Sequence, residues 1–151
     1  MHRAIVLALT LCGSALAAQQ HPLVGAWQLT YPAGVQIENG VRNVIMGDAE
    51  LTIAAQGDSL IATLVYQGRP DLPARPPSRM AAVAGAGPIV FVQRSMATLN
   101  TDGNEREAVA LSTWTLSANG DAIEGTVAHR IEGFPEGDQS PEPVKGTRRK
   151  G

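Results

Sequence analysis

The stretch AAQGDSLIATL at residues 54–64 returns in altered form as SANGDAIEGTV at residues 117–127. In each copy a Gly-Asp pair precedes a run with mostly apolar alternate residues, which is typical of a tight turn opening a half-buried β-strand. The repeat therefore predicts one hairpin unit used twice in a β-meander, since a solenoid or propeller needs at least about three copies. The alternating positions are Leu60, Ala62, Leu64 and Tyr66 in the first copy and Ile123, Gly125, Val127 and His129 in the second.

Outward from the repeat, short apolar runs and turn residues alternate along the rest of the chain. The 16 glycines and 10 prolines interrupt the sequence at short intervals, and no long window carries the three- and four-residue spacing of an amphipathic helix. We expect some candidate strands to fuse, which leaves about eight. The candidates are residues 24–31, 34–38, 41–46, 49–55, 59–67, 80–84, 88–94, 106–117, 122–132 and 144–149.

Several dipeptides between these runs predict tight reversals. Asn39-Gly40 is the strongest hairpin signal, because both central residues of a type I′ turn need positive φ. Gly47-Asp48, Gly57-Asp58, Asp102-Gly103 and Gly120-Asp121 predict further turns of this kind. Most consecutive strands are therefore expected to be antiparallel neighbours.

This pattern predicts an all-β fold, an antiparallel up-and-down β-barrel whose first and last strands pair. Closure removes the exposed strand edges that an open sheet would have to protect. A β-sandwich is the alternative. It needs a long crossover connection, and only residues 68–79 and 133–144 are candidates for one.

The N-terminal residues 1–17 are predicted to be a secretory signal peptide. A short basic start precedes an apolar run and the small residues that a signal peptidase reads, with cleavage after Ala17 or Ala18. The apolar run is shorter than the roughly 20 residues needed to span a bilayer. We therefore expect a periplasmic or secreted protein with a single barrel domain at residues 22–150, and no membrane insertion once the signal is removed.

Composition excludes several kinds of partner. The single cysteine, Cys12, would leave with the signal peptide, so the mature chain has no disulfide and no thiolate for a metal. Removal of Arg3 leaves 11 basic and 14 acidic residues. Without a basic surface, no nucleic-acid partner is expected, and we predict neither a metal nor a cofactor. A protein partner is left unspecified.

Two motifs resemble those of the lipocalin-like or calycin group of small β-barrels. Gly25-Ala26-Trp27, within HPLVGAWQLT, matches the Gly-x-Trp of the first strand, and Gly146-Thr147-Arg148 forms a closing basic strand. The resemblance implies that Trp27 packs at the closed end of the barrel and that a basic residue, Arg148 or alternatively Lys145, lies across its ring. It also implies structural roles for Gly25, Trp27 and Arg148.

No catalytic site is predicted. The mature chain has two histidines, His21 and His129, and lacks a nucleophile motif of the Gly-x-Ser-x-Gly type. Glu105 and Glu107 share one face of a strand, where paired carboxylates are usually solvated. We interpret His129 as a residue of the barrel lining or of its rim.

A barrel of eight strands is just wide enough to be filled by side chains or to hold one small ligand. We expect a modest apolar pocket for a small hydrophobic molecule, lined by Leu64, Tyr66, Phe91 and Trp114. A completely filled barrel is the alternative. The face that points inward stays open, because a shift of one residue in register exchanges the two faces of every strand.

Residues 68–79 contain four prolines and three arginines, which favours an extended segment with projecting cations. It could cover a barrel mouth, present a surface to an acidic partner, or be a solvated connection. The acidic segment at residues 133–144 could meet it at one rim. The alternative function is accordingly a non-enzymatic structural or protein-interaction module that uses the barrel surface and this segment.

Overall fold

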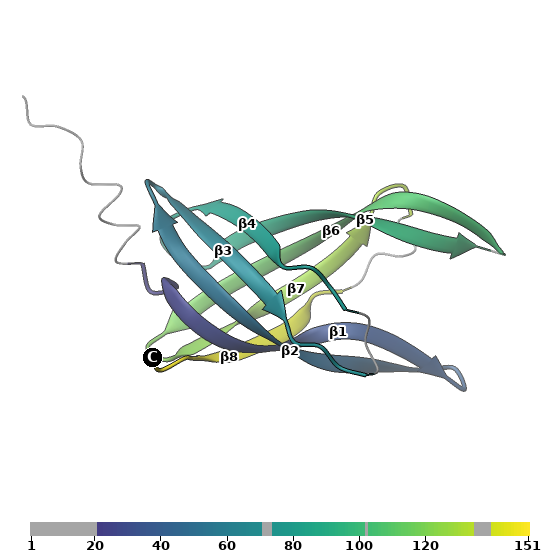
Figure 1. Ribbon diagram of the computed structural model, residues 1–151, viewed down its shortest axis with the longest axis horizontal. Helices are drawn as coiled ribbons and strands as arrows, with labels where there is room; N and C mark the ends of the chain where they lie inside the picture. Colours follow the sequence, from purple (N-terminus) through teal and green to yellow (C-terminus); the bar gives the residue numbers. More distant parts are fainter. Residues whose placement is uncertain (1–20, 71–73, 102, 135–139) are drawn as a thin grey trace, which may run out of the picture.

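The architecture comes from a computed structural model that describes residues 21–70, 74–101, 103–134 and 140–151. The predicted signal peptide lies outside these residues. Eight antiparallel strands form one sheet that curls into a nearly closed barrel (Figure 1), so the predicted up-and-down barrel is confirmed over the sandwich alternative. Within the described ranges, no helix has the length and apolarity to cross a membrane. The strands are β1 (Gly25–Glu38), β2 (Val41–Gln56), β3 (Ser59–Tyr66), β4 (Ser78–Val83), β5 (Ile89–Thr101), β6 (Asn104–Asn119), β7 (Ala122–Ile131) and β8 (Glu142–Arg148).

The sheet runs in the order β4-β3-β2-β1-β8-β7-β6-β5. The first and last strands pair as expected, with residues 27–30 of β1 against residues 145–148 of β8. Its two ends, β4 and β5, lie next to each other, but no backbone ladder joins them in the described part of the chain. A side-chain hydrogen bond of 2.7 Å from Nε2 of Gln93 to Oγ of Ser78 spans this seam.

Glycine-containing turns set the register of the hairpins. Asn39 and Gly40 have φ of 51° and 76°, which confirms a turn with positive φ at both central residues. Gly57 and Gly120 lie in the turns of the two repeat copies and have φ of 62° and 60°. Alternate side chains of β3 and β7 face inward as the repeat predicted. Asp102 lies outside the described residues.

The turn predicted at Gly47-Asp48 is wrong. Both residues lie within β2, where Gly47 pairs with Tyr31 of β1. A Cβ at Gly47 would come within 2.8 Å of Cβ of Ala33 and 3.3 Å of the Tyr31 ring. Glycine is thus needed here for close packing and not for a reversal. A register irregularity between Pro32 and Gly34 lets the two predicted N-terminal strands fuse into β1.

Buried apolar side chains fill the half of the barrel near the start of β1. Burial of these side chains is the main favourable term for a chain that would lack disulfides. The larger, fully buried members of the core are Leu23, Trp27, Leu29, Leu51, Ile53, Leu60, Leu64, Phe91, Leu116, Ile123, Val127 and Val144.

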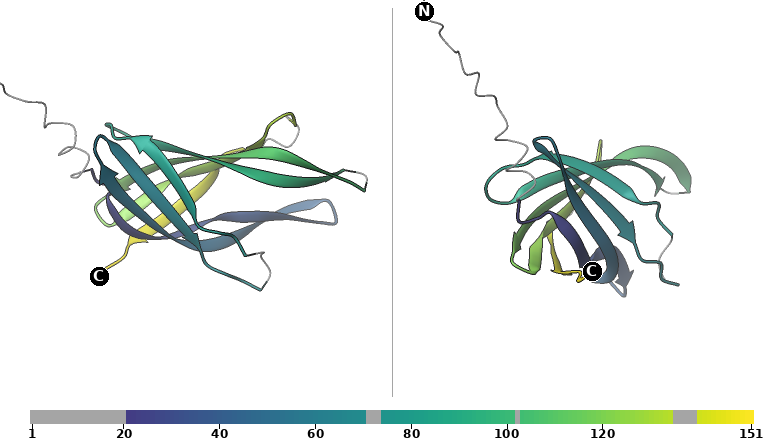
Figure 2. Two further views of the ribbon diagram at one scale, coloured as in Figure 1. Left: turned by 45° about the horizontal axis from the view of Figure 1, so that its top comes forward. Right: turned by 60° about the vertical axis from the view of Figure 1, so that its left-hand side comes forward.

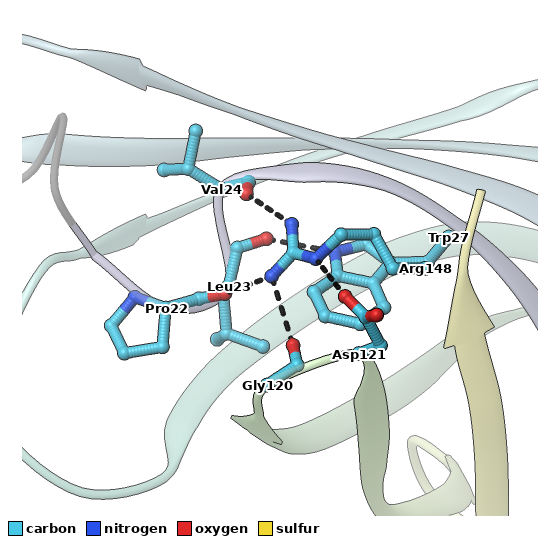
Figure 3. A network of polar contacts seen from close by, with 7 residues as sticks. All are labelled: Pro22, Leu23, Val24, Trp27, Gly120, Asp121 and Arg148. Atoms are coloured by element: carbon cyan, nitrogen blue, oxygen red, sulfur yellow. Dashed lines mark hydrogen bonds and ion pairs between the residues drawn. The ribbon is translucent and has the colours of Figure 1, made fainter. Parts of the chain in front are cut away.

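Trp27 and Arg148 close this end of the barrel (Figure 3). The guanidinium of Arg148 lies 4.1 Å from the centre of the Trp27 ring, the cation–π contact that the resemblance implied. Arg148 also donates hydrogen bonds of 2.9–3.2 Å to three backbone carbonyls and lies 3.4 Å from a carboxylate oxygen of Asp121. Gly25 has φ of 140°, and a Cβ there would collide with Nη1 of Arg148. The three carbonyls belong to Pro22, Val24 and Gly120.

Two hairpin arms extend past the opposite end of the barrel (Figures 1 and 2). The β1–β2 arm comprises residues 31–38 and 41–48, which pair only with each other among the described strands. The β5–β6 arm comprises residues 96–101 and 104–109 and is likewise a two-stranded ribbon. The bases of these arms flank the open end of the barrel.

Candidate ligand-binding site

A pocket of about 520 Å³ lies above the apolar core, at the open end of the barrel. This volume falls within the range of roughly 300–1,000 Å³ that is usual for small-molecule sites. The arms contribute Pro32, Ala33 and Val44 from one side and Met96 from the other. The barrel is therefore neither filled throughout nor hollow throughout: one half is core and the other half is pocket.

Polar side chains surround the pocket. Seven of the eight strands each contribute one buried or half-buried polar residue to its lining, and we call this set the polar ring; the exposed Ser95 of β5 also lines the pocket. The polar ring consists of Tyr31, Tyr66, Ser78, Gln93, Ser112, His129 and Glu142.

Hydrogen bonds connect much of the polar ring. The Tyr66 hydroxyl lies 3.1 Å from Oγ of Ser78, which also accepts the bond from Gln93. On the adjoining strands, Oγ of Ser112 lies 2.9 Å from Nδ1 of His129. Side chains held in this way are preorganised for binding, because their rotamers are fixed before a ligand arrives.

Aromatic side chains form one wall. The Tyr31 ring centre lies 5.6 Å from that of Tyr66 and 5.9 Å from that of Trp114, in tilted arrangements that aromatic pairs favour. Trp114 is 2 % exposed, and its indole N–H has no hydrogen-bond acceptor among the described residues. A buried donor without an acceptor is costly, so it marks a place where the structure is not optimised for stability alone.

The Pro/Arg-rich segment lies against the pocket. Arg75, Pro76 and Pro77 are part of the lining. The Arg75 guanidinium lies 5.6 Å from the Tyr66 ring centre and donates a 3.0 Å hydrogen bond to the Ala33 carbonyl. Of the roles considered from sequence, these contacts favour a cover for the barrel mouth. Of the acidic segment at residues 133–144, Glu142 lines the same pocket as Arg75, and residues 135–139 lie outside the described residues.

Burial changes the titration of two residues in the polar ring. It raises the pKa of Tyr31, an effect that the charge of Arg75 partly offsets. Burial lowers the pKa of His129, and the same arginine lowers it further. Both side chains are therefore neutral at physiological pH, and Arg75 is the cation that acts on them.

The residues predicted to bind ligand divide into two pairs. Tyr66 and Trp114 line the pocket. Leu64 and Phe91 are fully buried in the core: Leu64 lies two residues before Tyr66 on β3, and Phe91 lies two residues before Gln93 on β5, directly opposite Trp114. The inner face of β6 is the one that carries Trp114 and Ser112, which settles the alternative that the sequence left open.

Sequence reasoning missed Ser78, Gln93, Ser112 and Arg75 as pocket residues. One signal was available: a two-residue turn at Gly120-Asp121 fixes the register of the following hairpin and places Ser112 opposite His129. No comparable signal places Arg75, because it follows an irregular segment.

The described residues do not assemble a known catalytic arrangement. Ser112 and His129 are hydrogen-bonded, but Nε2 of His129 has no hydrogen-bond partner in the described ranges, whereas a catalytic triad needs a carboxylate there. In the same ranges, no group of three His, Cys, Asp or Glu side chains could hold a metal ion.

No family model matches the chain, and neither a curated protein nor a solved structure matches it. The fold is compatible with a calycin-like barrel, and the pocket itself must supply the argument for function.

Proposed function

We propose that this chain is an exported, lipocalin-like β-barrel that binds a small, largely apolar molecule in the pocket at its open end. The observation that carries the proposal is the 520 Å³ pocket between a filled core and the bases of two arms. A purely structural barrel gains nothing from such a space, because an unfilled interior forfeits packing contacts.

The lining supports the same function. Small-molecule sites are mostly apolar, with a few convergent polar groups that fix the orientation of the ligand. Here the rings of Tyr31, Tyr66 and Trp114 lie against one another, and the Tyr66 hydroxyl also belongs to the hydrogen-bonded polar ring. The aromatic rings offer a large contact area at little cost in conformational entropy.

Blocking the pocket tests the proposal. Ala110 lines the pocket from β6, and Ala110→Phe places a ring inside it. We expect titration with the neutral dye N-phenyl-1-naphthylamine to give saturable fluorescence enhancement for the unaltered protein and at least about tenfold weaker binding for Ala110→Phe.

The matched control is Ala81→Phe, because Ala81 is exposed on β4 and does not line the pocket. It should bind the dye like the unaltered protein. Equal dye binding by all three proteins would show that the dye reports surface association and would refute the pocket. Native mass spectrometry of the protein isolated from a periplasmic extract would identify a retained molecule, and its intact mass would locate the signal cleavage.

The alternative function is a protein-interaction module. Exposed apolar residues next to the β4–β5 seam favour it as a second candidate: Val83, Val90 and Val92 are 72 %, 49 % and 50 % exposed. A purified protein that binds no dye and elutes with a partner whose release follows Val83→Ser and Val92→Ser would support this function instead.

A further inference from the structure

Polar side-chain groups that are open to a ligand line the pocket. Arg75 is exposed, and among the described residues its five N–H groups make one hydrogen bond, to the Ala33 carbonyl, and no ion pair. The indole N–H of Trp114 is buried and has no acceptor within the described ranges, and Nε2 of His129 has no partner there. Arg75 and Trp114 thus offer donors at one site, and His129 adds a ring nitrogen.

The tautomer of His129 decides what its Nε2 offers to a ligand. The ring is neutral because burial disfavours its charged form. When the Ser112 hydroxyl donates to Nδ1, the single proton of the neutral imidazole lies on Nε2, which then acts as a donor; in the other tautomer Nδ1 donates to Ser112 and Nε2 accepts. In the first tautomer, a ligand that meets Nε2 presents an acceptor.

Charge points the same way. Arg75 affects the pKa of both Tyr31 and His129, which lie on different strands, so its field extends across the pocket. The carboxylate of the polar ring, Glu142, is engaged in an interaction of its own. Among the described residues, Arg75 is the one arginine or lysine of the pocket lining, and it forms no ion pair there.

The polar and apolar parts of the lining lie in a definite order. Beneath the polar ring, the core is filled. Above the ring, toward the arms, the lining is mainly apolar, with Pro32, Ala33, Val44 and Met96, and also includes the exposed Ser95. A ligand that satisfies both parts has its polar head toward the core and its apolar body between the bases of the arms. The pocket holds on the order of 15 non-hydrogen atoms, at about 30 Å³ each as for water.

We propose that the ligand is an amphipathic organic acid of this size, bound with its carboxylate in the polar ring beneath Arg75 and its apolar body between the arms. This inference rests on the proposed pocket function and adds the chemical class of the ligand. A carboxylate accepts several hydrogen bonds at once, and its bonds to a guanidinium are roughly twice as strong as those between neutral groups.

Matched pairs of probes test the charge of the head separately from the binding of the apolar body. The aliphatic pair is decanoate and decanol, and the aromatic pair is 4-phenylbutyrate and 4-phenylbutanol. Affinities are measured at pH 7.5 by displacement of N-phenyl-1-naphthylamine. We expect the acid of at least one pair to bind about tenfold tighter than its alcohol.

Arg75→Gln should reduce the affinity for the acid to that for the alcohol and leave the alcohol unchanged, which also shows that the pocket remains folded. Arg79→Gln is the control, since Arg79 is exposed on β4 and outside the lining. Its acid preference should equal that of the unaltered protein. Equal binding of acids and alcohols by the unaltered protein would overturn the inference and keep the pocket. Displacement of the dye by none of the four probes would also overturn the inference, whereas a lack of saturable dye binding would refute the pocket itself.

Discussion

Each end of the barrel has an arginine against an aromatic ring, and the two arginines are used differently. At the closed end, Arg148 lies 4.1 Å from the Trp27 ring centre and donates to three carbonyls, with Asp121 as its counter-ion. At the open end, Arg75 lies 5.6 Å from the Tyr66 ring centre and makes one hydrogen bond.

This difference indicates that Arg148 contributes mainly to stability and Arg75 mainly to ligand binding. A guanidinium whose donors are satisfied by its own chain fixes the structure and offers little to a ligand. A guanidinium with spare donors beside a pocket contributes less to folding and keeps its capacity for an anion. Substitutions at the closed end should therefore change the free energy of unfolding, and those at the open end should change affinity.

The largest effect is expected from Arg148→Ala. The substitution removes the cation–π contact and leaves the carbonyls of Pro22, Val24 and Gly120 without their donor. We expect a loss of about 3 kcal/mol in the free energy of unfolding, or roughly 10 °C in Tm. Urea unfolding followed by far-UV circular dichroism would measure it.

Arg149→Ala is the control for this comparison. Arg149 pairs with Glu50 at 2.9 Å, but both side chains are substantially exposed, 49 % and 41 %. Its removal should cost no more than about 0.5 kcal/mol. Equal losses for the two variants would mean that Arg148 acts only as another surface charge and would break the contrast between the two ends.

Local turn chemistry and distant motifs made much of the fold predictable from the sequence. Between two apolar runs, Asn39-Gly40 indicates a two-residue β-hairpin turn. The repeat predicted two hairpins, because each copy has a Gly-Asp turn followed by a strand with apolar side chains at alternate positions. Trp27 and Arg148 lie 121 positions apart, and the resemblance to calycin-type barrels, not a local pattern, linked them.

Features set by tertiary packing were not predictable. Gly47-Asp48 and Gly57-Asp58 have the same two residues, yet only the second is a turn, because Gly47 is required beneath Tyr31. The seam between β4 and β5 and the position of Arg75 depend on contacts between residues far apart in the sequence. Two of the four residues expected to line the pocket, Leu64 and Phe91, alternate correctly but lie in the core, because packing sets the depth at which the core ends.

A smaller effect is expected from Gly47→Ala, at the open end. The added Cβ would crowd Ala33 and the Tyr31 ring, which must shift to accept it. We expect affinity for the pocket probe to fall roughly fivefold, about 1 kcal/mol, and Tm to fall less than in Arg148→Ala, because one added methyl crowds two side chains whereas Arg148→Ala removes a cation–π contact and three hydrogen bonds. Gly68→Ala, where a Cβ would meet no atom within 4 Å, should bind normally.

The smallest effect is a dependence of stability on pH that arises from His129. Its pKa is lowered in the folded protein, so between that value and the unfolded value of about 6.5 the unfolded chain binds a proton that the folded chain does not. Stability from this residue is fully present above about pH 6.5 and is lost as the pH falls through the folded pKa.

His129→Gln removes the titration and retains a side chain that can hydrogen-bond to Ser112. Between pH 7.5 and pH 5, Tm of the variant should fall less than Tm of the unaltered protein, as measured by differential scanning calorimetry. If Tm falls equally in the two proteins as the pH is lowered, the His129 imidazole is in contact with solvent in the folded state. Arg75→Gln links this residue to the proposed ligand site. In the unaltered protein the charge of Arg75 disfavours the imidazolium form of His129, so the substitution should raise the pKa of His129. NMR titration of the imidazole would detect the change.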